Sequence, residues 1–219
     1  MRLQSKPLLQ VALDVLSTQR ALEIAGQVHP YWDIIEIGTP LMIAEGLSAL
    51  ESIKTRFPDK KYLADLKIMD AGKIEASLAF ARGADIVTVL AAADDLTIRG
   101  ALEAAEACGG QLMADLINVR DPLARAIELC AMKVPIICLH TAFDRRDSSK
   151  DIFHLLDAIR PAVGCELAIA GGLTLGSAGK AAARGADIVV VGSGITEHGD
   201  PRAAAHGLMR EIAEAAGRS

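Results

Sequence analysis

Apolar and polar positions alternate in blocks along the whole chain. Short runs of branched aliphatic residues recur at intervals of about 22–30 residues, with longer segments of mixed character between them. Runs that are almost continuously apolar are typical of parallel strands covered on both faces. The sequence therefore predicts strands at residues 8–14, 34–38, 61–67, 86–92, 111–117, 136–141, 166–172 and 188–192.

The segments between the predicted strands have the character of helices, for example residues 17–29, 43–56, 72–82 and 96–108. Strands that alternate with helices pair in parallel through crossover connections. Eight such units predict an α/β fold, a (β/α)8 TIM barrel with the helices outside. A doubly wound open sheet is the alternative, but it usually has fewer strands and would leave edges to protect. The 219 residues fit one barrel, so we expect a single domain over residues 1–219.

A repeated heptapeptide agrees with this organisation. ARGADIV occurs at residues 81–87 and again at 183–189. In both copies we expect a helix to end at Arg-Gly, because glycine readily adopts the left-handed conformation just past a helix. Internal duplication and convergent loop chemistry both explain the repeat, and both place it at the same structural step.

The composition argues against some classes of binding partner. The net charge of −5 and the lack of a Lys/Arg cluster argue against nucleic acid and against binding to a lipid surface. No apolar run reaches the roughly 18 residues of a membrane helix. Residues 1–14 indicate a first strand rather than a signal peptide. The four cysteines are far apart without a CxxC spacing, so we expect them to be small buried side chains of a cytoplasmic protein.

Charged residues interrupt the predicted strands near their carboxyl ends, where the sites of such barrels lie. The side chains in question are Asp14, Glu36, Asp65, Lys67, Asp115 and His140. Asp65 and Lys67 share one face of their strand and would be intolerable beneath the helices, so both should point into the barrel mouth. A structural ion pair at the rim is the alternative for these two alone. The recurrence of polar residues at equivalent strand ends favours a site.

Glu36 and Asp65 lie on neighbouring predicted strands, and their carboxylates would repel each other without a proton or cation between them. Oxygen ligands favour Mg2+, which takes one or two carboxylates plus water and substrate oxygens. Zn2+ would require more histidine or cysteine than this site offers.

The seventh and eighth predicted strands end in glycines, at Gly171, Gly172 and Gly192. Exposed backbone N–H groups there, with a helix amino terminus behind them, suit a phosphate group, although simple tight turns are the alternative. His140 is the histidine at a strand end, and an imidazole suits proton transfer near neutral pH. A buried, hydrogen-bonded histidine is the alternative for that position.

The segment DLKIMD, residues 65–70, resembles the D-x-K-x-x-D signature of the orotidine 5′-monophosphate decarboxylase superfamily. The resemblance extends over VALD (11–14), EIGTPL (36–41), ADLKIMDAG (64–72), ADLINVRD (114–121), LHTAFD (139–144), AGG (170–172) and VGSGIT (191–196). In detail the chain is similar to the 3-hexulose-6-phosphate synthase family. The related 3-keto-L-gulonate-6-phosphate decarboxylases typically have Glu at Asp115 and Arg at Phe143, so both positions favour the synthases. Ser193 departs from both patterns.

The resemblance implies a reversible, Mg2+-dependent aldol condensation of D-ribulose 5-phosphate with formaldehyde through a metal-stabilised 1,2-enediolate. It implies metal binding by Glu36 and Asp65, enediolate stabilisation by Lys67, and proton transfer by His140 with help from Asp115. Asp14 would hold a substrate hydroxyl and Lys67. Asp70 would reach the partner's site in a homodimer. The phosphate ligands would be Gly171, Gly172, Gly192 and Ser193.

Three other functions remain open from the sequence. The decarboxylase uses the same type of enediolate. A ribulose-phosphate epimerase would need more histidines at strand ends than this chain has. A non-catalytic barrel that binds a sugar phosphate would have no need of Lys67 or of the metal ligands.

Overall fold

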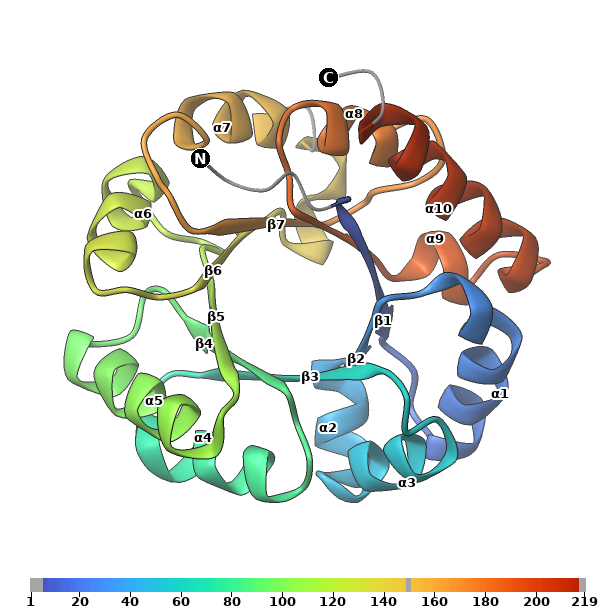
Figure 1. Cartoon of the computed structure of the whole chain (residues 1–219), viewed down its shortest axis with the longest axis horizontal. Coiled ribbons are helices and arrows are strands. Elements are labelled where there is room, and N and C mark those ends of the chain that lie inside the picture. Colours follow the sequence, from blue (N-terminus) through green and yellow to red (C-terminus); the bar gives the residue numbers. More distant parts are fainter. Residues whose placement is uncertain (1–5, 149–150, 217–219) are drawn as a thin grey trace.

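The strands close into one parallel barrel. A computed structural model of the chain describes residues 6–148 and 151–216, and its strands pair in the closed order β1 to β8, with helices around the outside (Figure 1). This confirms the (β/α)8 fold. The strands are β1 (Leu8–Leu13), β2 (Ile34–Ile37), β3 (Lys61–Ile68), β4 (Ile86–Leu90), β5 (Gln111–Asp115), β6 (Ile136–His140), β7 (Glu166–Ala170) and β8 (Ile188–Val191).

Each strand lies where the apolar runs predict it, and the ends differ by one or two residues. The helices are α1 (Thr18–Val28), α2 (Thr39–Glu45), α3 (Ser48–Arg56), α4 (Gly72–Ala81), α5 (Asp95–Cys108), α6 (Pro122–Ala131), α7 (Asp151–Ile159), α8 (Ala178–Ala183), α9 (Ser193–Thr196) and α10 (Pro201–Ala216). Short 3-10 segments are η1 (His29–Tyr31) and η2 (Phe143–Ser148).

The single helix predicted over residues 43–56 is wrong. The segment folds as α2 and α3, separated by Gly46, whose φ of 66° lies outside helical conformation. The glycines of the repeated heptapeptide behave as expected. Gly83 and Gly185 follow α4 and α8 with φ of 94° and 91°.

The inside of the barrel has an apolar layer and a polar layer. Ile34, Leu63, Ile86 and Met113 belong to one buried cluster on the inner face of β2 to β5. Two residues further along the same strands come Glu36, Asp65, Thr88 and Asp115, which are buried as well. Because side chains alternate with a period of two, these polar groups also face inward, nearer the carboxyl ends. The fold thus collects polar groups at one end of a closed apolar barrel.

The cysteines correct the sequence-based expectation. Cys138 is buried, but Cys108 is exposed and Cys130 and Cys165 are half-buried. Among the described helices, none combines the length and the apolar character needed to cross a membrane.

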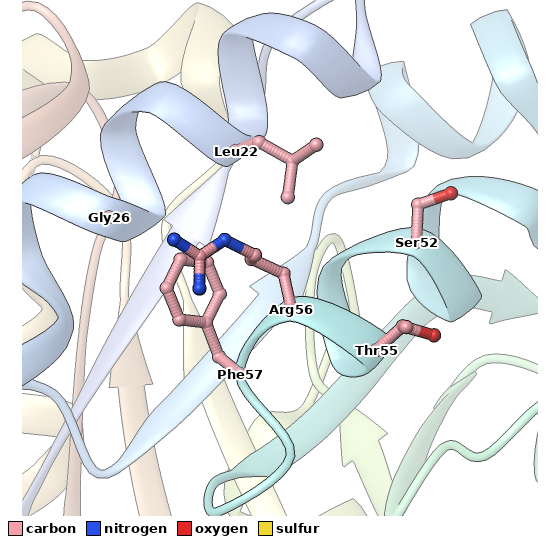
Figure 2. Close-up of a pocket in the computed structure, with 6 residues that line it drawn as sticks. All are labelled: Leu22, Gly26, Ser52, Thr55, Arg56 and Phe57. Carbon is pink, nitrogen blue, oxygen red and sulfur yellow. The ribbon is translucent and has the colours of Figure 1, made fainter.

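A surface pocket of about 380 Å³ lies between α1 and α3, on the outside of the barrel. Figure 2 shows its lining, which consists of Leu22, Gly26, Ser52, Thr55, Arg56 and Phe57. The Arg56 guanidinium lies over the Phe57 ring, 5.3 Å from its centre. None of the residues predicted to form the site lines this pocket.

Candidate active site

An irregularity in β3 sets the orientation of the Asp65 and Lys67 side chains. Ala64 pairs with Val87 and Ile68 pairs with Val89, so four steps along β3 correspond to two along β4. Lys67 lies inside this bulge with φ of 47°, a left-handed conformation that is rare for a lysine. A bulge of this kind redirects side chains and is common beside active sites. Here it leaves Asp65 and Lys67 turned toward each other.

The Thr88 hydroxyl replaces the ladder contact that the bulge removes. It accepts a hydrogen bond from the Lys67 backbone N–H at 2.9 Å and donates to Asp65 Oδ1 at 2.8 Å. On the other side, the Thr39 hydroxyl lies 2.7 Å from Asp65 Oδ2. Two hydroxyls from neighbouring elements therefore fix the plane of the Asp65 carboxylate.

The Lys67 ammonium joins two buried carboxylates. Its Nζ lies 2.6 Å from Asp65 Oδ2 and 3.6 Å from Asp115 Oδ2. Burial alone would lower the pKa of Lys67, but the charges of Asp65 and Asp115 outweigh it and raise the pKa. Burial would likewise raise the pKa of Asp65, but Lys67 and the two threonine hydroxyls outweigh it and lower that pKa. The pair of Asp65 and Lys67 is ionised at neutral pH.

Asp115 extends this chain of contacts to His140. Its Oδ2 lies 2.7 Å from His140 Nδ1, and its Oδ1 accepts the Ile117 backbone N–H at 2.9 Å. A carboxylate on Nδ1 favours the tautomer with the proton on that nitrogen, which leaves Nε2 as the basic atom. His140 ends β6 and Asp115 ends β5, so two neighbouring strands set this contact.

Glu36 lies in the same inner layer, on β2. Gln10 Nε2 donates to Glu36 Oε2 at 2.6 Å. Burial raises the pKa of the Glu36 carboxyl well above its usual value, and the negative charges of Asp65 and Asp14 raise it further. Lys67 opposes this rise only in part. The mouth therefore holds more buried negative charge than Lys67 compensates.

A divalent cation fits this excess of negative charge. In the described residues no group of three or more His, Cys, Asp or Glu side chains is arranged to hold a metal by itself. Mg2+ needs fewer protein ligands, because it usually keeps several waters and takes oxygens from its substrate. The oxygen donors of Glu36 and Asp65 are of the type that Mg2+ prefers.

Asp14 lies at the rim, between two glycines. A Cβ on Gly38 would come within 2.2 Å of Asp14 Oδ1, and a Cβ on Gly192 would come within 3.1 Å of Oδ2. The carboxylate thus occupies space that only glycines leave open after β2 and β8. Its expected contact with Lys67 stays a prediction.

The glycines after β7 have two different roles. A Cβ on Gly171 would lie 2.3 Å from the Thr141 carbonyl oxygen, so close packing requires glycine there. Gly172 has φ of 71° and nothing within 4 Å of the position of a Cβ, so a ligand could approach its backbone closely. Ser193 begins the four-residue α9, whereas the helix after β7 starts only at Ala178. The helix amino terminus expected directly behind the β7 glycines is therefore absent among the described residues.

The structure brings most predicted site residues together. Asp65, Lys67, Asp115 and His140 are joined by direct contacts, and Glu36 and Asp14 act on each other electrostatically. Asp70 is exposed outside this set, where its Oδ1 accepts the Ala71 N–H at 2.7 Å.

Sequence reasoning missed Gln10 and Thr88. Both are polar residues inside apolar strand runs. Gln10 shares a strand face with Asp14, and Thr88 lies on the strand that pairs with the strand of Asp65. A polar residue inside an apolar run was the sequence signal that could have identified both.

We predict that Glu36→Gln stabilises the metal-free protein. Because the Glu36 pKa is raised by folding, its contribution to stability is full below about pH 4.5 and is lost as pH rises through the folded-state pKa. A glutamine removes the charge and keeps an oxygen for Gln10, so the gain at pH 8 in EDTA should be about 1–3 kcal/mol. Urea unfolding at pH 5 and pH 8 measures it. A variant no more stable than wild type at pH 8 would contradict this electrostatic interpretation.

Comparisons with known proteins identify the family of the chain. The model of the orotidine 5′-phosphate decarboxylase / HUMPS family matches residues 7–208. A 3-hexulose-6-phosphate synthase from Bacillus subtilis (strain 168) is 43% identical over 207 residues, which are 94% of this chain and 99% of that protein.

Two solved structures extend the likeness to three dimensions. A crystal structure of 3-hexulose-6-phosphate synthase matches with a TM-score of 0.89 and 41% identity, over 94% of this chain and 100% of that one. A crystal structure of KGPDC from Streptococcus mutans matches with a TM-score of 0.88 and 26% identity, over 95% of this chain and 98% of that one. The chain belongs to the orotidine 5′-phosphate decarboxylase / HUMPS family, and within it to the enzymes of the 3-hexulose-6-phosphate synthase type.

Proposed function

We propose that the chain catalyses the Mg2+-dependent, reversible aldol condensation of D-ribulose 5-phosphate with formaldehyde to D-arabino-hex-3-ulose 6-phosphate, through a 1,2-enediolate. The observation that carries this proposal is the connected set Asp65, Lys67, Asp115 and His140 at the barrel mouth. The synthase relatives support the same reaction class.

His140 is the base in this proposal. The hydrogen on C1 of the sugar phosphate lies next to the C2 ketone and is weakly acidic. With Nδ1 held by Asp115, Nε2 removes this proton, and the Asp115 carboxylate stabilises the imidazolium that results.

Lys67 stabilises the charge that develops when the proton leaves. Its ammonium has three N–H donors, and its contacts with the carboxylates of Asp65 and Asp115 fix its position. A donor that is fixed before the reaction stabilises an enediolate oxygen without reorganising, which is the most effective form of electrostatic catalysis. C1 then attacks the formaldehyde carbon, a C–C bond forms, and the new alkoxide takes the proton back from His140.

Mg2+ would be held by Glu36 and Asp65, and when bound it would supply a Lewis-acid charge to the substrate oxygens. Asp14 would accept a hydrogen bond from a substrate hydroxyl at the rim. Thr39 and Thr88 hold Asp65 in one orientation for this task. Burial raises the pKa of Glu36 most, and a bound cation would offset the further rise that the charges of Asp65 and Asp14 cause.

The phosphate would bind across the mouth, at Gly171, Gly172, Gly192 and Ser193. The open space beside Gly172 supports this position.

Asp70 would act in the site of a second subunit. It is exposed, and it lies outside the connected charges of its own chain. The neighbouring side chains Met69, Ile74 and Leu78 are large, apolar and exposed, which is typical of a surface that is covered on association. We propose a homodimer in which each Asp70 completes the partner's site.

The proposed function predicts metal-dependent consumption of formaldehyde. Purified protein with ribulose 5-phosphate and Mg2+ should deplete formaldehyde, and EDTA or omission of the sugar phosphate should stop it. A colorimetric formaldehyde assay follows the reaction. Lys67→Ala should lose turnover by a factor of at least about 100, since it removes a preorganised donor to a developing oxyanion.

Other outcomes identify the alternatives. Release of CO2 from 3-keto-L-gulonate 6-phosphate without formaldehyde consumption would indicate the decarboxylase, contrary to what Asp115 and Phe143 indicate. Inactivity toward both substrates in protein that is folded and loaded with Mg2+ would contradict the proposal and favour a binding barrel.

Mixed dimers test whether Asp70 serves the partner's site. We predict that Asp70→Ala and Lys67→Ala are each inactive alone. A heterodimer of the two, co-expressed and purified through two different tags, should recover about half of the wild-type activity, because one of its two sites is then intact. A mixed dimer as inactive as its parents would contradict the shared site.

A further inference from the structure

Gln10 is a polar residue within the apolar layer of the barrel. It lies on β1, where it pairs with Ile34 of β2 and with Val190 of β8. Both partners belong to the buried apolar cluster on the inner face, as does Ala12, two residues further along β1. Gln10 itself is 1% exposed. An aliphatic side chain would suit this position, so the amide calls for an explanation.

The Gln10 side chain extends from the apolar layer into the polar layer. Ala12 pairs with Glu36, so these two residues lie at the same height in the barrel and Gln10 lies below them. The small side chain of Ala12 leaves room for the longer side chain of Gln10. The Gln10 Nε2 donates to Glu36 Oε2 at 2.6 Å. A residue of one layer thereby holds a carboxylate of the next.

The amide is oriented by this contact, and its other end is left without a partner. An ionised carboxylate offers only acceptors, so the donor end of the amide faces Glu36. Among the buried side-chain nitrogen and oxygen atoms of the described chain, only Gln10 Oε1 and Trp32 Nε1 have no hydrogen-bond partner. An unpaired buried acceptor costs free energy. Stability alone therefore does not account for a glutamine at this position.

Carboxylates that bind metals are usually held by further hydrogen bonds, which fix their orientation. The hydroxyls of Thr39 and Thr88 do this for Asp65. The corresponding contact for Glu36 comes from Gln10. Mg2+ also keeps several waters, which are donors that an unpaired acceptor such as Gln10 Oε1 could use.

We propose that Gln10 is a positioning residue of the metal site, which holds Glu36 in the orientation that binds Mg2+. This inference rests on the proposed function, in which Glu36 is a metal ligand. Without the amide, Glu36 keeps its oxygens but loses the contact that fixes them. Affinity for the cation should then fall by a factor of about 10–100, the usual effect of removing such an outer partner.

The test is a titration of full-length, substrate-free protein with Mn2+, in which electron paramagnetic resonance measures the free ion. Mn2+ takes the same oxygen ligands as Mg2+. We expect Gln10→Leu to bind Mn2+ about 10–100-fold more weakly than wild type. Leucine suits the apolar layer, and thermal melting in EDTA verifies the fold. Excess Mg2+ should restore turnover, because the variant keeps every group that touches the substrate.

Trp32→Phe is the matched control. It removes the other unpartnered buried atom, Nε1 of Trp32, which directly precedes the amino end of β2. The Trp32 ring packs edge-on against Tyr62, with the ring centres 6.2 Å apart. This variant should melt at a lower temperature and bind Mn2+ with wild-type affinity. It thereby separates a loss of stability from a loss of positioning.

The outcomes distinguish this inference from the proposed function. Wild-type Mn2+ affinity in Gln10→Leu, together with lost binding in Glu36→Ala, would overturn the role of Gln10 and leave the proposed function standing. Equal binding by wild type and Glu36→Ala would contradict the metal assignment itself, and the inference would fail with it.

Discussion

A buried ammonium between two carboxylates is the interaction on which the active site depends. Lys67 compensates Asp65 on its own strand and Asp115 two strands away, and Asp115 in turn orients His140. Without this cation, the mouth would hold several buried carboxylates with no positive charge between them, which is costly in a low-dielectric space. The charge on Lys67 therefore lowers the pKa of Asp65 and holds the two carboxylates together at the mouth.

The buried charges of the active site and the apolar core that stabilises the fold occupy different layers of the barrel. Apolar side chains fill the inner layer nearer the amino ends, and the polar layer lies above it on the same strands. The left-handed backbone at Lys67 and the raised pKa of Glu36 are both unfavourable for the metal-free protein. Both occur at the mouth, which agrees with the general tendency of active sites to concentrate strain. The closed sheet beneath tolerates this because it carries the core.

Much of this structure could be predicted from residue patterns, and the rest depends on tertiary geometry. The apolar runs predicted every strand, because parallel strands that are covered on both faces are almost continuously apolar. Asp65, Lys67, Asp115 and His140 stood out because charges are rare inside such runs. The break at Gly46 was missed, since glycine inside a helical pattern is often tolerated. The bulge at Lys67 and the partnership of Thr88 with Asp65 depend on register between strands, which a single sequence does not show.

Proton exchange at C1 of the sugar phosphate tests the central claim most directly. Ribulose 5-phosphate is incubated in deuterated water with Mg2+ and enzyme but without formaldehyde, and deuterium at C1 is followed by NMR. We predict exchange by wild-type protein. We predict almost none by His140→Asn, whose amide can still donate to Asp115 but has no basic nitrogen. Exchange by this variant at the wild-type rate would contradict the assignment of His140 as the base that the Lys67–Asp115 pair holds in place.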